Sequence, residues 1–415
     1  MKKQIIWLGL ILLACSCSAA NEEYQSLFKC SKKLDKPYGI CTHINRRGPR
    51  YEYDTQAQDV RMMGSAGAAL FRTDWDLPSM IKKGSSGLDF SHFDRMVSTT
   101  DSMGMKGLAI ITAMGNYRAS DIDMWSNQVM QQVDHFKQVT YWEVINEVDI
   151  CRRWLPNIYA KEYIDMLRKG YQAVKRGNRK AQVLFSGLAN SDTNFLDSVL
   201  SAGVNNCFDI MNVHRYNHKK DEPESLLDYY IRLEKKLTKY QINKPLWLTE
   251  CGCSTAEGWA TEETQAMRLP RIFLISFACG VDKVFWYKSR SRELDSTDKE
   301  DFFGLWHKDY TPKPAFYAYQ TLTRMCPNKS TRPKLVRYGK VYVASWKRPD
   351  GKRVWALWTS KNNEIVKLHV NSNYKCYDIF GKIKTFPNQI VETTPSILYF
   401  EGGRKFEQSL LDSFQ

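Results

Sequence analysis

Several common sequence signals are missing from this 415-residue chain. No two cysteines are spaced Cys-x-x-Cys, which argues against a structural zinc site. No Gly-x-Gly-x-x-Gly follows the first apolar run, which argues against a dinucleotide-binding sheet. The basic residues are scattered and match no nucleic-acid-binding module, so nucleic acid is not an expected partner. Beyond the N-terminal leader, no apolar run is long enough to span a membrane. These absences leave a globular body with no predicted metal.

The N-terminus carries the pattern of an export signal. Two lysines precede the apolar run Ile5–Ala14, which is too short to span a bilayer and is typical of a signal peptide. The run ends in LLAC at Cys15, which resembles the bacterial lipobox, whose cysteine is lipidated. We therefore expect residues 1–20 to hold a lipoprotein signal peptide, with Cys15 as the lipid anchor to the bacterial cell envelope, on the periplasmic or surface side of the outer membrane. An ordinary signal cleaved near Ala20 is the alternative.

The body of the chain alternates short apolar runs with amphipathic segments. Hydrophobic residues make up 43% of the chain and aromatic residues 13%, which is typical of a folded protein. A continuous apolar run is expected of a parallel strand that is buried on both faces. Residues 18–33 are polar and are interpreted as a tether. Eight apolar runs follow it: Tyr38–His43, Ala68–Trp75, Gly107–Met114, Thr140–Glu147, Gln182–Ala189, Asp209–Tyr216, Pro245–Gly252 and Val281–Ser289.

Helical segments separate several of these runs. Tyr159–Lys175 and Ser225–Thr238 carry apolar residues every three or four positions, as amphipathic helices do. Strands that alternate with helices favour a parallel α/β sheet, and eight units favour a closed (β/α)8 TIM barrel over residues 34–325. Beyond it, short strand-like runs between turn signals predict a small C-terminal antiparallel β-sandwich domain over residues 326–404. Residues 405–415 are interpreted as a tail.

Two of the eight apolar runs end in glutamate. The fourth run closes with Asn146 and Glu147, and the seventh reaches Glu250. Because active sites of (β/α)8 barrels lie at the C-terminal ends of the strands, both carboxylates should project into one site. They are 103 residues apart, or three barrel units of roughly 31 residues each, so they can face each other across the barrel. Two opposed carboxylates are what hydrolysis of a glycosidic bond requires. The spacing alone leaves both retention and inversion of the anomeric centre open.

This pattern resembles the clan A glycoside hydrolases, especially families 39 and 5, which are retaining enzymes on (β/α)8 barrels. The resemblance implies that Glu147 is the acid/base and Glu250 the nucleophile in double displacement on a β-linked glycan. It also implies substrate-binding roles for six other residues, the last of them by a looser match: Asn146, Arg72, His214, Tyr216, Trp286 and His43. Since carboxylates do the proton work, no metal or other cofactor is expected. Ile145 and the Cys251-Gly252-Cys253 turn depart from the commonest clan forms, which leaves the family and the sugar open.

Two other functions fit the same barrel. A carbohydrate-binding surface lipoprotein would often lack one of the two carboxylates, and both are present here. A transglycosylase shares the covalent intermediate but passes it to a sugar instead of water. In each case the expected partner is an oligo- or polysaccharide, and the formal charge of +15 favours an anionic one. The lipid anchor adds the membrane as a second partner.

Overall fold

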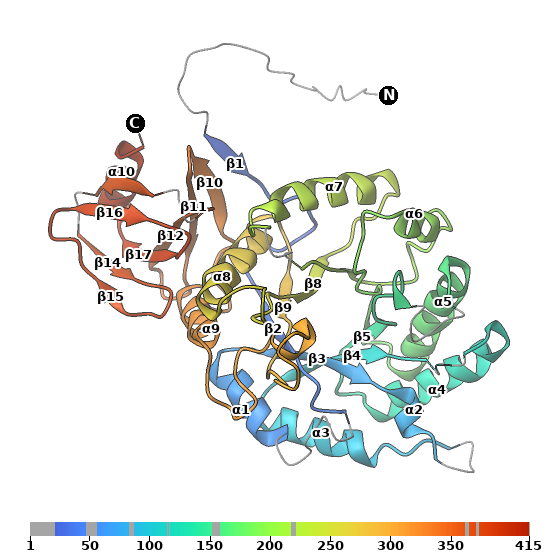
Figure 1. The fold of residues 1–415 in the computed structure, drawn as a ribbon. Coiled ribbons are helices and arrows are strands. Elements are labelled where there is room, and N and C mark those ends of the chain that lie inside the picture. The colour runs from blue at the N-terminus through green and yellow to red at the C-terminus, as the bar shows by residue number, and fades with distance from the viewer. Residues whose placement is uncertain are drawn as a thin grey trace, which may run out of the picture.

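The computed structural model describes residues 21–46, 56–82, 87–113, 115, 117–151, 158–216, 221–361, 365–370 and 373–414. The expected signal peptide of residues 1–20, with Cys15, lies outside these residues. The described part of the chain forms a barrel of parallel strands enclosed by helices, with a second β domain at one side (Figure 1). None of the described helices combines the length and the apolar character needed to cross a membrane.

Eight parallel strands form the barrel in the order β6-β5-β4-β3-β2-β9-β8-β7. The two end strands meet through the parallel bridges Leu184↔Ile210 and Leu188↔Val213, which close the barrel. The predicted (β/α)8 fold is therefore confirmed. The barrel strands are β2 (Tyr38–Cys41), β3 (Leu70–Trp75), β4 (Lys106–Ile111), β5 (Tyr141–Val144), β6 (Gln182–Leu184), β7 (Met211–His214), β8 (Leu246–Cys251) and β9 (Lys283–Trp286).

Helices surround the strands and bury their apolar sides against them (Figure 1). The predicted amphipathic helices correspond to α5 and α7, and α5 turns Tyr163, Met166 and Leu167 into the core. The helices of the barrel region are α1 (Gln56–Ser65), α2 (Leu77–Met80), α3 (Ser91–Ser102), α4 (Ile122–His135), α5 (Ala160–Gly177), α6 (Asn194–Leu200), α7 (Ser225–Lys239), α8 (Glu262–Ala278) and α9 (Pro314–Met325), with short 3₁₀ turns η2 (Ala119–Asp121) and η4 (Lys299–Asp301).

The barrel has two separate apolar regions because side chains alternate along each strand. A compact inner cluster fills the barrel below its mouth, and it includes Leu70, Leu108, Leu184, Trp247 and Phe285. The larger outer cluster lies between the strands and the helices. Only those residues at the strand ends whose side chains point into the barrel can therefore contribute to a site at its mouth.

The C-terminal domain is built on an antiparallel sheet in the order β1-β10-β11-β12-β17-β14-β15, with a separate pair β13-β16. One face of the large sheet packs on the barrel, where the indole Nε1 of Trp346 donates to the carbonyl of Met325 at 2.8 Å. Its other face encloses a second core. The predicted β sandwich is thus confirmed. Its strands are β10 (Lys334–Tyr338), β11 (Val341–Lys347), β12 (Arg353–Thr359), β13 (Val366–His369), β14 (Tyr374–Tyr377), β15 (Ile383–Lys384), β16 (Ile390–Thr393) and β17 (Leu398–Gly402).

Both ends of the described chain are more ordered than the sequence predicted. The expected tether contains a strand, β1 (Glu22–Tyr24), which pairs with β10 at the edge of the large sheet. The expected tail contains a helix, α10 (Arg404–Asp412). Phe406 and Leu410 of α10 are buried in the second core, because their spacing of four places both on one helix face. Each segment is short, so its pattern was too brief to indicate structure by itself.

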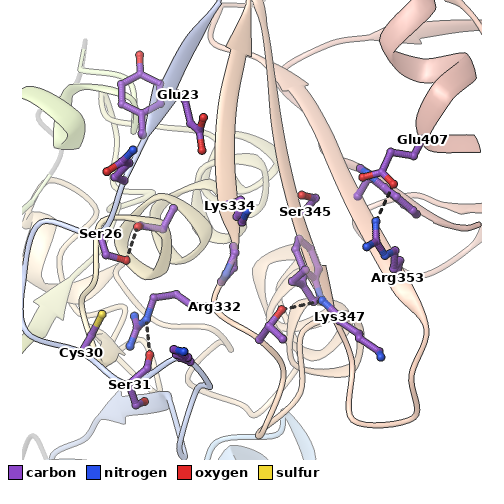
Figure 2. A pocket seen from close by; sticks show the side chains of 18 residues that line it. Glu23, Ser26, Cys30, Ser31, Arg332, Lys334, Ser345, Lys347, Arg353 and Glu407 are labelled. Atoms are coloured by element: carbon purple, nitrogen blue, oxygen red, sulfur yellow. Dashed lines mark hydrogen bonds and ion pairs between the residues drawn. The ribbon is translucent and has the colours of Figure 1, made fainter. Parts of the chain in front are cut away.

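The N-terminal segment and the large sheet border a cavity of about 770 Å³ (Figure 2). Two contacts fix the segment there: Ser26 Oγ donates to the carbonyl of Ala278, and Arg332 Nε donates to the carbonyl of Ser31 at 3.1 Å. Across the cavity Arg353 pairs with Glu407 at 2.6 Å. The cavity therefore belongs to the joint between the N-terminal segment and the β domain, away from the C-terminal ends of the barrel strands.

Candidate active site

The two glutamates singled out by the sequence lie at the C-terminal ends of opposite strands. Glu250 is still within β8, whereas β5 ends at Val144, so that Glu147 lies three residues beyond its strand. Ile145 and Glu147 have positive φ angles of 63° and 43°, which L-residues seldom adopt. This left-handed backbone turns the chain sharply, and the amide of Glu147 donates to the carbonyl of Gly187 at 3.1 Å. The turn aims the Glu147 side chain into the mouth of the barrel.

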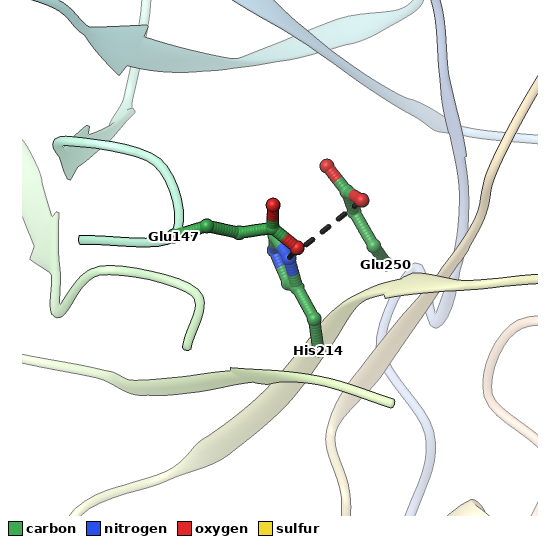
Figure 3. Close-up of side chains that lie close together, drawn as sticks. All are labelled: Glu147, His214 and Glu250. Atoms are coloured by element: carbon green, nitrogen blue, oxygen red, sulfur yellow. Dashed lines mark hydrogen bonds and ion pairs between the residues drawn. The ribbon is translucent and has the colours of Figure 1, made fainter. Parts of the chain in front are cut away.

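Glu147, His214 and Glu250 converge on one point (Figure 3). One oxygen or nitrogen from each side chain lies within 4.8 Å of the other two. His214 Nδ1 is 3.0 Å from Glu147 Oε1 and 3.6 Å from Glu250 Oε2, so the imidazole bridges the two carboxylates. Among the described residues, no other group of His, Cys, Asp and Glu side chains is close enough together to hold a metal ion.

Arg72 on β3 connects the buried carboxylates. Its Nη1 donates to Glu250 Oε1 at 2.5 Å, while its Nε and Nη2 form a bidentate pair with Glu143 at 2.7 and 2.9 Å. Nη2 also donates to Asn146 Oδ1 at 2.7 Å. Because the amide oxygen of Asn146 is engaged in this way, its NH2 group is the end left to donate to a ligand.

A hydrogen-bonded chain fixes the tautomer of His214. Thr249 Oγ donates its hydrogen to Asn212 Oδ1 at 2.6 Å, so toward His214 it can only accept. His214 Nε2, 3.1 Å away, therefore carries a hydrogen, and Nδ1 is the atom that exchanges a proton with Glu147. Gly187 makes room for the ring, because a Cβ there would lie 2.1 Å from Nε2.

The surroundings of the two glutamates push their pKa values apart. Burial raises the pKa of Glu147 above its ordinary value, and the negative charge of Glu250 adds to this shift. Burial also opposes ionisation of Glu250, but the charges of His214 and Arg72 outweigh it and hold the pKa of Glu250 below its ordinary value. Tyr216 assists by donating a short hydrogen bond to Glu250 Oε2. Glu147 therefore keeps its proton to a higher pH than Glu250 does, as an acid and a nucleophile in one site require.

These groups lie in a pocket of about 580 Å³ at the mouth of the barrel, within the usual size range of ligand pockets. Glu147, Glu250, Asn146, Arg72, Tyr216 and His43 all line it, so six of the predicted site residues come together there. His214 lies directly behind the two glutamates and is 1% exposed. His43 is largely enclosed, and burial together with the charge of Arg46 lowers its pKa, which keeps the imidazole neutral.

The structure corrects the assignment of Trp286 to the substrate pocket. Trp286 is fully buried in the outer cluster, between the strands and the helices, and does not line the pocket. Its neighbour Tyr287 faces the mouth instead and packs edge-on against Tyr216 and Phe303. Side chains alternate along a strand, so an error of one position moves a residue to the opposite side of the barrel wall.

Several residues of the site were not predicted. Glu143, fully buried inside the barrel, accepts hydrogen bonds from Arg72 and from the amide of Gly187 at 2.9 Å. The sequence did indicate a role for Glu143, because a glutamate inside an apolar strand needs a charged or hydrogen-bonding partner nearby. Thr249 and Asn212 carried no signal beyond a polar residue within an apolar run. Trp259, in the loop after β8, lines the pocket but belongs to no strand, so strand-end reasoning did not reach it.

The geometry defines a class of protein: two opposed carboxylates with separated pKa values, in a pocket at the mouth of a (β/α)8 barrel, form the site of a glycoside hydrolase. The family model described as glycosyl hydrolase catalytic core matches residues 81–305, more than half of the chain. The chain belongs to this family, and the protein is a glycosidase. No match was found among curated protein sequences.

Solved structures share the architecture. A family 39 glycoside hydrolase from the gut symbiont Bacteroides cellulosilyticus has a TM-score of 0.73 and 20% identity, covering 90% of this chain and 82% of that one. A glucosidase from Croceicoccus marinus has a TM-score of 0.66 and 13% identity, covering 93% and 99%. A monomeric β-xylosidase from Caulobacter crescentus has a TM-score of 0.64 and 14% identity, covering 90% and 97%. At these identities the similarity concerns the fold.

Proposed function

We propose that the protein is a retaining glycosidase that cleaves β-linked glycans, with Glu147 as acid/base and Glu250 as nucleophile. The observation that carries this proposal is the short separation of the two side chains: one carboxylate oxygen of Glu147 lies within 4.8 Å of one carboxylate oxygen of Glu250. Retaining enzymes place their carboxyl groups about 5–5.5 Å apart, whereas inverting enzymes need roughly 6.5–9.5 Å to admit a water molecule between carboxylate and sugar. The distance in this site fits direct attack by a carboxylate.

The reaction follows from the protonation states. In the first step the ionised Glu250 attacks the anomeric carbon while the bond to the leaving oxygen breaks, and Glu147 gives that oxygen its proton. A covalent ester between the sugar and Glu250 results. In the second step Glu147, now ionised, takes a proton from water, whose oxygen attacks the anomeric carbon and releases Glu250. His214 lies close enough to both glutamates to balance their charge as the proton moves.

The neighbouring residues have supporting roles in this proposal. Arg72 and Tyr216 hold one oxygen each of Glu250, which orients the nucleophile and keeps it ionised. The free NH2 group of Asn146 donates to a sugar hydroxyl beside the anomeric carbon. Tyr287 and Phe303 present aromatic surface, which suits the C–H face of a sugar ring.

The test is an activity screen of the leaderless protein on aryl β-glycosides and on neutral and acidic oligosaccharides. The variants Glu147→Ala and Glu250→Ala should each lose most of the turnover. Added azide should restore activity to Glu250→Ala with inverted product, because the small anion takes the place of the missing carboxylate. Turnover that survives Glu250→Ala without azide would overturn the assignment. Binding without turnover in the wild-type protein would favour a carbohydrate-binding lipoprotein.

The charge of the pocket supports an acidic glycan as substrate. Arg215 lines the pocket and forms no ion pair with any described residue, although its guanidinium stacks on Tyr229 at 5.2 Å. A guanidinium that has no ion-pair partner among the described residues, at the mouth of a pocket, favours a carboxylate or sulfate group on the ligand. We expect Arg215→Gln to reduce kcat/KM on an acidic oligosaccharide much more than on its neutral analogue. Equal losses on both substrates would contradict this preference.

We also propose that Cys15 is lipidated and attaches the enzyme to the bacterial cell envelope. The support is the short apolar run that ends in LLAC. Metabolic labelling with a fatty acid analogue should mark the wild-type protein and leave Cys15→Ala unlabelled. Label retained in Cys15→Ala and lost in Cys17→Ala would move the anchor to the second cysteine.

A further inference from the structure

A second cavity adjoins the active-site pocket. It has a volume of about 260 Å³, and Trp259 lines both cavities. Lys299 Nζ lies 5.7 Å from the centre of the indole ring, and Lys299 is itself a residue of the active-site pocket. A glycan that leaves the active-site pocket across Trp259 therefore reaches the second cavity directly.

The second cavity is polar and its charges are balanced. Its floor consists of Arg268 and Arg271, which are 5% and 1% exposed. Glu222 accepts from Arg268 at 3.2 Å and from Arg271 at 3.0 Å, while Glu224 pairs with Arg271 at 2.5 Å. With two carboxylates against two guanidinium groups, the floor offers fixed donors and acceptors without excess charge. Such a surface suits the hydroxyl groups of a neutral sugar better than an acidic group.

The walls complete a slot of the kind that sugars occupy. Trp259 forms one side, Met267 of α8 another, and Pro395 of the C-terminal domain closes the cavity. An aromatic ring beside a polar floor matches a sugar ring, which has apolar C–H faces and hydroxyl groups on its edge. The C-terminal domain thus contributes directly to a cavity beside the active site.

We propose that this second cavity is a binding subsite for a further, neutral sugar unit of the glycan whose scissile bond lies between Glu147 and Glu250. The inference rests on the proposed function and deepens it: the substrate is an oligosaccharide that extends past Trp259. The enzyme then prefers longer chains, because each chain gains contacts in the second cavity that a single sugar unit cannot make.

The test compares substrates of different length on variants of the second cavity. The probes are the aryl β-monoglycoside with the highest turnover and di- to tetrasaccharides in which neutral sugar units extend the same sugar. Met267→Trp fills the second cavity and Trp259→Ala removes its wall. For both variants we expect the ratio of kcat/KM on the tetrasaccharide to kcat/KM on the aryl glycoside to fall about tenfold, which corresponds to ~1.4 kcal/mol of interaction lost in the second cavity. Gln172→Trp, in a separate small pocket beside α5, is the matched control and should keep the wild-type ratio.

Binding measured without turnover separates this inference from the proposed function. On the Glu250→Gln background, calorimetry should show tighter binding of the tetrasaccharide than of the disaccharide, and Met267→Trp should remove the difference. Unchanged ratios in both cavity variants, or equal affinities for both lengths, would overturn the subsite. If the folded wild-type enzyme turned over none of the glycosides, the proposed function would be refuted. The calorimetric comparison of the tetrasaccharide with the disaccharide would still test the subsite.

Discussion

At the scale of single residues, the site depends on a buried network of charges. Arg72 is 2% exposed and serves Glu143, Glu250 and Asn146 at once. Its guanidinium is the only described cation that contacts the fully buried Glu143. Removing it leaves a carboxylate with no counter-charge in a region that water does not reach.

Arg72→Met should therefore destabilise the fold as well as abolish activity. We expect a loss of about 3–5 kcal/mol in the free energy of unfolding, because one partner of a buried pair is left alone. Urea titration followed by fluorescence measures it. Arg353→Met, which breaks the exposed pair with Glu407, should cost at most about 1 kcal/mol. Similar losses in the two variants would show that the buried network does not hold the barrel together.

The hydrogen bond from His214 to Thr249 should set the alkaline limb of the pH profile. Activity requires Glu250 ionised and Glu147 protonated, so kcat/KM falls at low pH as Glu250 takes up a proton and at high pH as Glu147 loses one. In Thr249→Val the hydrogen on Nε2 of His214 has no acceptor, so the charged form of the imidazole is less stable. Because the charge of His214 favours the ionised form of Glu147, losing it raises the pKa of Glu147, and the alkaline limb should shift to higher pH. Thr249→Ser should keep the wild-type profile, and an unshifted limb in Thr249→Val would contradict the role of Thr249.

Residue-level reasoning from the sequence predicted that the two glutamates share one site, and the structure brings both into one pocket. Their placement could be predicted because an apolar run that ends in a charged residue indicates the C-terminal end of a barrel strand. The reasoning failed at Trp286, because neighbouring residues of β9 point to opposite sides of the barrel wall. The sequence there is a run of aromatic residues, which does not indicate which of them faces the pocket. The reasoning also missed Trp259, because a loop has no periodicity to follow.

At the scale of elements, the barrel helices and strands were predictable and the chain ends were not. Continuous apolar runs marked all eight barrel strands, although the turn after β5 begins at Ile145, before the predicted end of that strand. The helix α10 was not predicted, because only two of its nine residues are buried and two apolar residues are too few to show a helical pattern. The strand β1 escaped because its three residues, Glu-Glu-Tyr, are stabilised by pairing with β10, which lies more than three hundred positions away in the chain.

Helix α10 should be essential to the second core despite its length. Phe406 packs against Trp355 and Phe400 with ring centres 4.9 and 5.2 Å apart. We expect Phe406→Ala to lower the free energy of unfolding by about 3–5 kcal/mol, as large-to-small changes of buried aromatic residues do. Leu411→Ala on the exposed face of the same helix is the control and should cost little. Thermal melting measures both, and equal melting temperatures would show that α10 is dispensable.

At the scale of the whole molecule, the barrel and the β domain share one continuous core. Residues of the large sheet, including Trp346, Trp358 and Tyr399, belong to the same apolar cluster as the barrel helices. Trp358 Nε1 also donates to Glu224 at 2.7 Å, close to the second cavity. The β domain is therefore part of the barrel's own packing.

A single unfolding transition should follow from this shared core. Differential scanning calorimetry of the wild-type protein is expected to show one peak, with the calorimetric and van't Hoff enthalpies equal. A chain that ends after residue 333 should be insoluble, because it exposes the side of the barrel that the sheet covers. Two resolved peaks, or a soluble and active truncated barrel, would show that the domains fold independently.

The position of β1 has a geometric consequence for an enzyme held by Cys15. The segment after β1 is fixed to the end of α8, where Leu27 donates to the carbonyl of Cys279, and this end of the helix leads into the N-terminal end of β9. From Cys15 to Glu22 the chain spans at most about 25 Å. The connection to such an anchor is therefore short, and it begins at the edge of the β domain, where Glu22 pairs with Arg337 of β10. An enzyme anchored at Cys15 would hold this edge of the β domain within about 25 Å of its point of attachment to the membrane.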